Sequence, residues 1–356
     1  MKKSVLLLTP VFDQGGTETY IVSLGKYLVN NGYSVIIVSA GGIREKEISN
    51  NGLKHEKVLN LRKKGILKAL SCIIKISKII RNNNINIIHS SSIYTLILAN
   101  IIAKFNYKKH IKTVYTMHGG PNENVERTSK WILNKCVDSI IVLSQNAKDN
   151  LIKNGVKKSK LTVVYNGIEY NGFIRKNEEK DKEENKIKIV SIGRLTKQKG
   201  HKYLIEALSL LENFNYEVYI IGEGELKVEL NNKIKSLMLE NKVKLLGFRS
   251  NIYDYLSEAD IFILPSLWEQ FPISILEAMM FELPIIASNV NGIEEEIGET
   301  GILINSRNIE EIRKAIEKLI LHPKLREEKG KAAKKRFLEN FTLDTMGRNT
   351  VKVYEE

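Results

Sequence analysis

The pattern of hydrophobic and polar positions along the chain predicts short buried strands that alternate with amphipathic helices. In the first half, runs rich in Val, Ile and Leu indicate strands at 5–8, 34–39, 85–89, 112–117, 139–143 and 161–165. Helical periodicity lies between these runs, at about 17–30, 66–81 and 91–105. Because strands that alternate with helices form parallel sheets with right-handed crossovers, this half is expected to be a doubly wound domain.

The same pattern restarts after residues 175–188, a segment that is almost wholly charged or Asn and is typical of a linker at a domain boundary. Further strand candidates are 188–192, 217–221, 243–246, 261–264, 284–288 and 301–304. The predicted fold class is α/β, with two doubly wound Rossmann-like domains facing a central cleft. Such sheets bind ligands at the carboxyl ends of their strands.

Composition narrows the class of protein. Of the 356 residues, 43% are hydrophobic and 27% charged, as in ordinary globular proteins of about two domains. Cys72 and Cys136 lie far apart, so cysteine spacing indicates neither a disulfide framework nor a zinc site. The apolar run at 5–8 is too short for a signal peptide, and no stretch reaches the ~18 apolar residues of a membrane span. A cytoplasmic protein is therefore expected.

The excess positive charge lies in the first half of the chain. Residues 1–175 contain 27 Lys and Arg against 10 Asp and Glu, whereas residues 176–356 contain 28 against 31. A basic surface of this kind suits nucleic acid, an anionic membrane or an acidic substrate. No nucleic-acid recognition module or pattern of stacking aromatics is present, so we expect no nucleic-acid partner. We expect peripheral docking on an anionic inner membrane leaflet, where each surface cation contributes ~1 kcal/mol.

The helix predicted at 66–81 lies within this basic region. One stripe of the helix consists of Ile66, Leu70, Ile73, Ile74 and Ile80, and the basic residues around its other face are Lys68, Lys75, Lys78 and Arg81. The stripe is expected to pack against the first sheet, as the apolar stripe of a surface helix usually does. The basic flanks, including 62–64, are the expected membrane contacts.

Two features of the first half are candidates for ligand binding. Gly15 and Gly16 stand between a strand and a helix, where a ligand can approach the backbone and an anion can meet the helix N-terminus. A tight strand-to-helix turn explains the same pair when the motif is taken alone. His118 follows the strand at 112–117, which places it on a strand-end loop facing the cleft. A structural, hydrogen-bonded His remains the alternative there.

Two cations stand just after the first strand of the second half, Arg194 and Lys199 in the segment GRLTKQKG. They suit a diphosphate, because Arg offers a forked set of donors and Lys a point charge. Solvated surface charge is the alternative. Gly222 ends a later strand but lacks the third glycine of a dinucleotide fingerprint, so a nicotinamide cofactor is not indicated.

The most specific segment is 263–295, in which Glu269 and Glu277 are eight residues apart. Pro272 suits the first turn of a helix that continues from Ser274. Amide groups at a helix start and two carboxylates could hold a sugar diphosphate, because the amides bind anionic oxygens and the carboxylates accept hydrogen bonds from hydroxyls. A buried helix with two surface acids is the alternative.

Six motifs taken together resemble the family 4 retaining glycosyltransferases, in particular the branch that builds bacterial cell-surface polysaccharides and glycolipids. They are GGTE (15–18), MHG (117–119), NGI (166–168), GRLTKQKG (193–200), EQFPISILEAM (269–279) and the run 284–292. The resemblance covers essentially the whole chain. It implies a GT-B fold, with an acceptor-side domain at 1–170, a donor-binding domain at 171–340, and a closing helix at 341–356 that packs back on the first domain.

The resemblance also implies a role for each matching residue. Arg194 and Lys199 would hold the donor diphosphate, Glu277 the ribose, and Glu269 the hydroxyls of the donor sugar. The other implied donor contacts are Gly16 opposite the diphosphate, His118 near the sugar, Gly222 and Arg249 beside the base, and the main chain of Phe271, Pro272, Ile273 and Ser274. His118, Glu269, Arg194 and Lys199 form the implied catalytic set.

Three residues depart from the family pattern, because Gln270, Glu282 and Asn291 stand where the family commonly has Gly. The departure at Gln270 makes the donor sugar the uncertain part of the reaction, since this side chain would lie beside it.

The expected reaction moves a hexose or N-acetylhexosamine from a nucleotide-diphosphate sugar, with a UDP-sugar expected, to a glycan or lipid-linked saccharide. The motifs provide no protein nucleophile, so a same-face displacement that retains the anomeric configuration is expected. They also contain no Asp-x-Asp pair, so no metal cofactor is expected. One alternative is a nucleotide-sugar epimerase on the same fold, which would convert the donor without an acceptor. Another is a non-catalytic basic adaptor for membranes or nucleic acid, which would bind no nucleotide sugar.

Overall fold

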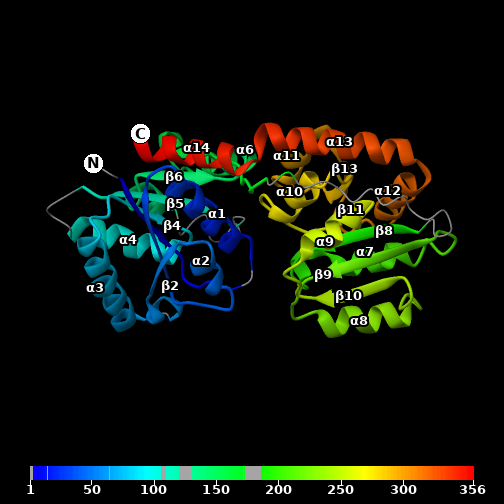
Figure 1. Cartoon of the computed structure of the whole chain (residues 1–356), viewed down its shortest axis with the longest axis horizontal. Coiled ribbons are helices and arrows are strands. Elements are labelled where there is room, and N and C mark those ends of the chain that lie inside the picture. Colours follow the sequence, from blue (N-terminus) through cyan, green and yellow to red (C-terminus); the bar gives the residue numbers. More distant parts are fainter. Residues whose placement is uncertain are drawn as a thin grey trace. The chain divides into compact units, whose positions relative to one another are not determined.

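The computed structural model describes residues 3–13, 15–63, 65–105, 110–119, 130–170, 172 and 186–356. The chain divides into two compact units (Figure 1). Unit 1 contains residues 1–169 and 343–356, and unit 2 contains residues 170–342. Most of the polar segment predicted as a linker, up to residue 185, lies outside the described residues.

Unit 1 contains a parallel sheet in which the described residues form seven strands, in the order β3-β2-β1-β4-β5-β6-β7. The strands are β1 Ser4–Leu8, β2 Ser34–Ser39, β3 Lys54–Lys57, β4 Ile87–Ser90, β5 Lys112–Met117, β6 Ser139–Val142 and β7 Leu161–Val163. The helices are α1 Gly16–Asn30, α2 Lys46–Asn50, α3 Ile66–Asn82, α4 Ile93–Phe105, α6 Gln145–Lys153 and α14 Leu343–Glu355, with 3-10 turns η1 Leu59–Arg62 and η2 Lys158–Lys160.

Helices cover both faces of this sheet because successive strand residues point to opposite sides. Val5 and Leu7 of β1 belong to the core beneath α1 and α14. Leu6 and Leu8 of the same strand belong to the core beneath α3 and α4. Apolar side chains on both faces of the strands are the reason these strands appear in the sequence as continuous hydrophobic runs.

The edge strand β3 was not predicted. Its sequence, Lys-His-Glu-Lys, contains no aliphatic residue, and its side chains are exposed or half-buried. The backbone pairs with β2 in parallel, with Lys54 opposite Ile36 and Lys57 opposite Ser39. Charged residues are common on edge strands because they discourage pairing with other chains. Hydrophobic patterning therefore cannot reveal a strand of this kind.

Unit 2 contains a second parallel sheet, in which the described residues form six strands in the order β10-β9-β8-β11-β12-β13. The strands are β8 Ile187–Ile192, β9 Tyr216–Ile221, β10 Val243–Gly247, β11 Ile261–Leu264, β12 Ile285–Ser288 and β13 Ile302–Ile304. The helices are α7 His201–Leu208, α8 Lys227–Ser236, α9 Ile252–Glu258, α10 Ile273–Met280, α11 Ile293–Ile297, α12 Ile309–Leu321 and α13 Pro323–Asn340, with 3-10 turns η3 Lys197–Lys199 and η4 Gly298–Thr300.

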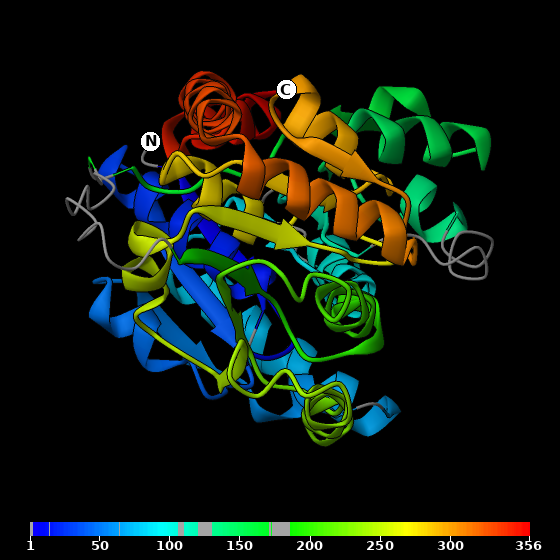
Figure 2. The same cartoon turned by 90° about the vertical axis from the view of Figure 1, so that its right-hand side faces the viewer.

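One core of unit 2 joins α7, α8 and α12 to the sheet, as Leu204 of α7, Leu230 of α8 and Ile316 of α12 pack with Ile189 and Ile263. In Figure 2, α7 and α8 (shades of green) are seen nearly end-on, on the same side of this sheet. The order β9-β8-β11 places β8 between strands that come later in the chain. Loops that follow such central strands form the ligand-binding edge of a doubly wound sheet. The predicted pair of doubly wound α/β domains is confirmed.

The last helix, α14, is part of unit 1 although the chain reaches it through unit 2. Met346, Val353 and Tyr354 of α14 are buried in the core that α1 covers. Lys112 of β5 donates a hydrogen bond from Nζ to the carbonyl oxygen of Val353 (2.6 Å), near the helix C-terminus. A cation at that end is favourable because the helix dipole is negative there.

The prediction for α3 was wrong for three of its five stripe residues. Ile80 is buried and Ile73 is half-buried, whereas Ile66, Leu70 and Ile74 are exposed. The helix has two apolar stripes, and the one that faces the core consists of Cys72, Ile76 and Ile80. Hydrophobic periodicity identifies both stripes but does not decide which of them meets the sheet. Within the described ranges, no helix is long and apolar enough to cross a membrane.

Candidate active site

A nearly buried ion pair joins two motifs that are seventy residues apart in the sequence. Lys199 ends the 3-10 turn after β8, and Glu269 follows β11. The Lys199 Nζ lies 2.5 Å from Glu269 Oε1, and their side chains are only 12% and 8% exposed. The Ser266 hydroxyl donates a second hydrogen bond to the same carboxylate oxygen (2.9 Å). Because its charge is held by a cation and a hydroxyl, Glu269 is positioned to accept hydrogen bonds with its remaining oxygen.

Close backbone contacts hold the loops around this pair. Gly222 has φ 147°, and a Cβ added there would lie 2.0 Å from the carbonyl oxygen of Gly193. Gly200 has φ 65°, and a Cβ there would lie 2.1 Å from the carbonyl oxygen of Pro265. Only glycine fits both the conformation and the space at these two positions. The β8, β9 and β11 loops are therefore in direct backbone contact beside Lys199.

Arg194 differs from Lys199 in its exposure. Its side chain is solvent-exposed, and Nη2 donates to Gln198 Oε1 over 3.3 Å. The Gln198 amide in turn donates to the carbonyl oxygen of Trp268 (3.0 Å), directly before Glu269. The guanidinium thus keeps most of its donors available to an anion at the rim of the site.

The helix α10 begins at Ile273, with Pro272 as its N-cap, so the predicted start was one residue late. The first amide groups of a helix have no intrahelical acceptor and attract anionic oxygens. Phe271 is buried, and its ring packs edge-to-face against Phe341 at 5.3 Å, which holds the entry to the helix. Glu277 is half-buried one turn further along the helix than Ile273.

Two buried titratable residues near the ion pair were missed by the sequence analysis. Glu296 of α11 is fully buried, and neither carboxyl oxygen has a hydrogen-bond partner among the described residues. Burial raises the pKa of Glu296 well above its usual value, and the nearby charge of Glu269 adds to this effect. His201 begins α7, and burial, with the nearby charge of Lys199, lowers its pKa to about 3. Burial therefore favours the neutral form of both groups.

A signal for Glu296 was present in the sequence. Ile293, Glu296 and Ile297 have the spacing i, i+3, i+4, which places all three on one face of a helix. The structure buries that face. The run of acids at 294–296 suggests solvent exposure, whereas the apolar spacing around it correctly predicts that Glu296 is buried.

The three departures from the family pattern have different structural meanings. Glu282 has φ 60° and Asn291 has φ 45°, so both adopt the left-handed conformation that glycine accepts most easily. Gln270 does not have a positive φ, and its side chain is 5% exposed with Oε1 unpartnered among the described residues. At Glu282 and Asn291, the left-handed backbone conformation explains why the family commonly has glycine there. At Gln270 the change instead adds a buried amide next to Glu269.

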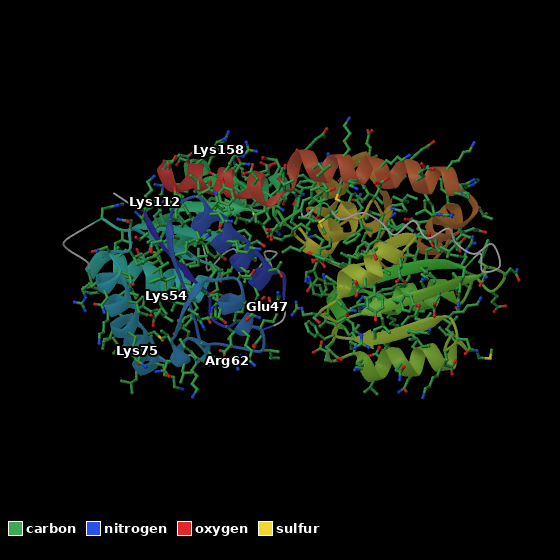
Figure 3. The ribbon with its side chains drawn as sticks, in the orientation of Figure 1. Glu47, Lys54, Arg62, Lys75, Lys112 and Lys158 are labelled. Carbon is green, nitrogen blue, oxygen red and sulfur yellow. The ribbon has the colours of Figure 1, made fainter. Side chains whose placement is uncertain are left out.

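In unit 1, the glycine pair begins α1. Gly15 is extended, and Gly16 is the first helical residue. A Cβ at Gly15 would lie 2.8 Å from the carboxylate of Glu18, which is buried in the first turn, and burial raises the pKa of Glu18. Arg44 donates from Nη1 to the carbonyl oxygen of Gly15 (3.0 Å) and forms an ion pair with Glu47 (2.7 Å), which Figure 3 labels.

His118 lies at the end of β5 and contacts α1. Its ring meets the ring of Tyr20 edge-on at 4.6 Å, and its Nε2 is buried without a hydrogen-bond partner among the described residues. Burial lowers the pKa of His118 to about 3, so the imidazole is neutral. Tyr20, Thr116, His89 and Tyr354 form a buried hydrogen-bonded chain, with distances of 3.2, 2.6 and 2.6 Å between successive polar atoms. The chain connects α14 to the residues that support His118.

The predicted site residues thus fall into two groups. Lys199, Glu269, and the start of α10 come together in unit 2, with Arg194 at the rim. Gly222 and Arg249 follow β9 and β10 of the same sheet, and the amide of Gly222 donates to the carbonyl oxygen of Gly247 (2.9 Å). Gly16 and His118 belong to unit 1.

Comparison with models of protein families matches both halves of the chain. The model described as Glycosyltransferase Family 4 matches residues 14–171, and the model described as Glycosyl transferases group 1 matches residues 173–336. Together they cover the chain from α1 to α13.

Two relatives of known activity align with somewhat less than two thirds of their length. The chain is 33% identical over 248 residues to UDP-Gal:alpha-D-GlcNAc-diphosphoundecaprenol alpha-1,3-galactosyltransferase of Escherichia coli, covering 64% of each chain. It is 30% identical over 228 residues to N-acetylgalactosamine-N,N'-diacetylbacillosaminyl-diphospho-undecaprenol 4-alpha-N-acetylgalactosaminyltransferase of Campylobacter jejuni, covering 63% of this chain and 62% of the relative.

A solved structure of similar fold is that of a glycosyltransferase from Rickettsia africae ESF-5. The TM-score is 0.85 at 25% sequence identity, and the alignment covers 99% of this chain and 98% of the other.

Proposed function

The chain belongs to the family 4 glycosyltransferases and has the GT-B fold, and on this basis we propose that it transfers a hexose or N-acetylhexosamine from a UDP-sugar to a lipid-linked saccharide. The observation that carries the proposal is the nearly buried Lys199–Glu269 ion pair with Arg194 at the rim. The activities of the two relatives support it, because both act on saccharides linked to undecaprenol through a diphosphate, and one uses UDP-galactose. The product would enter cell-surface polysaccharide or glycolipid synthesis.

The proposed chemistry retains the configuration at the anomeric carbon. The bond from the anomeric carbon to the β-phosphate oxygen breaks, and the acceptor hydroxyl forms the new bond on the same face. The acceptor proton passes to the departing phosphate oxygen. Arg194 and Lys199 stabilise the negative charge that develops on the leaving group, an electrostatic contribution that positioned cations supply without reorganisation. No metal ion is required in this scheme, and we expect turnover in the presence of a chelator.

Recognition of the donor is assigned to the residues around α10. The first amide groups of α10 would bind phosphate or sugar oxygens, and Glu277 would accept hydrogen bonds from the ribose. Glu269 and the buried amide of Gln270 would contact the hydroxyls of the sugar. Gln270 is therefore the residue that we expect to influence the choice of donor sugar.

A thermal-shift screen of the full chain against UDP-, ADP-, GDP- and TDP-sugars tests donor binding, because a ligand that binds only the folded state raises the melting temperature. A UDP-sugar is expected to give the largest shift. Transfer by the best donor is then measured with a diphospho-undecaprenol-linked saccharide, and the anomeric configuration of the product is read by NMR. An inverted product would overturn the retaining scheme.

The same assays separate the two alternatives. Conversion of the donor into another nucleotide sugar without an acceptor would indicate an epimerase. Absence of any nucleotide-dependent shift would indicate a non-catalytic protein. A loss of activity in chelator that a divalent ion restores would overturn the proposed metal independence.

A further inference from the structure

The outer face of α3 exposes four large aliphatic side chains. Ile66 and Leu67 are each 82% exposed, Ile74 is 68% exposed and Leu70 is 50% exposed. Positions 66, 70 and 74 are successive turns of one helix face, and 67 lies beside 70. The face toward the sheet is separately filled by Cys72, Ile76 and Ile80. Clustered exposed apolar residues of this kind mark interaction surfaces, whereas single ones are ordinary.

Cations surround this apolar ridge. Lys68, Lys75, Lys78 and Arg81 are exposed on the same helix, and Arg62 and Lys63 are exposed directly before it. The sequence contains no Asp or Glu between Glu56 and Glu123. Figure 3 labels Lys54, Arg62 and Lys75 along this part of unit 1. Arg62 is paired with Asp13 (2.8 Å), whereas the helix itself contains no acid, so the local charge around the ridge is positive.

The neighbouring turn η1 extends the surface. Leu59 is 63% exposed on this turn. The Asn60 side chain donates from Nδ2 to the Ser71 hydroxyl (3.1 Å), which ties η1 to α3. The apolar and basic residues thus belong to two elements that are held together.

We propose that α3 lies flat on a bilayer containing anionic lipids, with Ile66, Leu67, Leu70 and Ile74 inserted at the boundary between headgroups and acyl chains. Lys68, Lys75, Lys78 and Arg81 contact the anionic headgroups. The combination favours a lipid surface because the apolar face of such a helix is buried among acyl chains while the Lys and Arg beside it are attracted to anionic headgroups. This inference deepens the proposed function, because it brings the enzyme to a lipid-linked acceptor, but donor chemistry does not depend on it.

Vesicle sedimentation of the full chain tests the proposal. The wild type is expected to pellet with vesicles of phosphatidylcholine and phosphatidylglycerol and to remain in solution with phosphatidylcholine alone. A triple variant, Ile66→Ser, Leu70→Ser and Ile74→Ser, should bind the anionic vesicles at least tenfold more weakly with an unchanged melting temperature. Equal binding of wild type and triple variant, or equal binding to neutral vesicles, would overturn the proposal.

A matched control removes exposed apolar side chains elsewhere. Val228 is 71% exposed on α8 and Met238 is 88% exposed just after it, in unit 2. The double variant Val228→Ser and Met238→Ser should bind anionic vesicles as the wild type does. A loss as large as that of the triple variant would show that apolar exposure in general, and not α3, drives binding.

Insertion itself is measured with a fluorescent residue at the ridge. Leu67→Trp should shift its emission to shorter wavelength on anionic vesicles and be quenched by brominated acyl chains, whereas Val228→Trp should show neither effect. Unquenched Leu67→Trp on bound vesicles would overturn insertion. Failure of wild type to bind, together with self-association in solution, would point to a second copy of the chain as the occupant instead.

Donor hydrolysis and vesicle binding distinguish a failure of this inference from a failure of the proposed function. Hydrolysis of the soluble donor is expected to be unchanged in the triple variant, because α3 belongs to unit 1 and Lys199 to unit 2. Vesicle binding without donor turnover would contradict the proposed function alone, and donor turnover without vesicle binding would contradict the membrane inference alone.

Discussion

The two units share a doubly wound architecture but differ in how they distribute charge. Unit 1 contains 28 Lys and Arg against 13 Asp and Glu, a net charge of +15, whereas unit 2 contains 27 against 28, a net charge of −1. In unit 2, Lys199 and Glu269 form a nearly buried ion pair. In unit 1 the cations of α3 are exposed around an apolar ridge. The same fold therefore carries a nearly buried ion pair in one unit and an extended basic surface in the other.

The contrast extends to the buried polar groups. In unit 1, His89 and His118 are both neutral because burial lowers the pKa of each to about 3. His89 belongs to a hydrogen-bonded chain that runs from Tyr20 through Thr116 to Tyr354 of α14, and His118 packs against the Tyr20 ring. In unit 2 the interior beside the site contains an ion pair, and burial raises the pKa of the nearby Glu296. Each of the following changes breaks one side of this comparison.

The largest effect is expected for Lys199→Ala. Loss of the cation should lower turnover about 100- to 1,000-fold, as does removal of one group that stabilises charge in a transition state. It also leaves the nearly buried Glu269 without its partner. Removing one member of a buried pair typically costs about 3–5 kcal/mol of unfolding free energy. Donor hydrolysis and chemical denaturation measure the two effects.

Arg194→Ala is the matched exposed change. It should reduce turnover by a similar factor with little loss of unfolding free energy, because this side chain is exposed and its hydrogen bond to Gln198 is long, at 3.3 Å. Unchanged turnover in both variants would contradict the assignment of these cations to the leaving group. Equal destabilisation of both would contradict the contrast between buried and exposed cations.

The next change, Glu296→Gln, tests the neutral carboxyl. Burial raises the pKa of Glu296 in the folded state, so the folded protein keeps a proton that the unfolded chain releases above its ordinary pKa of 4.5. The unfolded state then binds fewer protons, and folding stability falls as pH rises through that range. Glu296→Gln removes this loss, so the variant should gain stability relative to wild type as pH rises from 4 to 8. A pH-independent difference in melting temperature would show that folding leaves the pKa of Glu296 unchanged.

Tyr354→Phe tests the hydrogen-bonded chain of unit 1. It removes the hydroxyl that lies 2.6 Å from His89 Nδ1 and leaves a buried ring nitrogen without that partner. The expected loss of unfolding free energy is about 1–3 kcal/mol. Tyr33→Phe is the control, because Tyr33 packs at the edge of the same core. Equal stability of the two variants would indicate that the chain contributes nothing measurable.

The smallest effect is expected where a non-glycine residue has a positive φ. Glu282→Gly should raise unfolding free energy by about 0.5–1 kcal/mol, because a left-handed conformation costs a residue with a Cβ about 1–2 kcal/mol and the half-buried ion pair with Lys334, at 3.3 Å, offsets only part of that. Glu282→Ala, which removes the same contact and keeps the strain, is the control. A gain in Glu282→Ala as large as in Glu282→Gly would attribute the effect to the side chain.

Much of the fold was accessible from the sequence because both sheets are buried on two faces. Their strands appear as continuous aliphatic runs, and the helices between them have a clear period. β3 escaped detection because an edge strand does not need aliphatic side chains. Motif order likewise predicts a donor site at Arg194, Lys199, Glu269 and Glu277, because these side-chain types suit a diphosphate and sugar hydroxyls, and those roles stay predictions.

What the sequence by itself determined was therefore the alternation of elements, the inventory of charged and polar groups, and the excess of cations in the first half. The tertiary structure alone decided which groups meet and which remain exposed. Lys199 and Glu269 are brought together because the loops after β8 and β11 lie side by side in the sheet. The pKa of Glu296 is raised because packing removes its solvent. The outer stripe of α3 faces water because the sheet can cover only one of its two apolar faces, and periodicity along one helix contains no information about its neighbours.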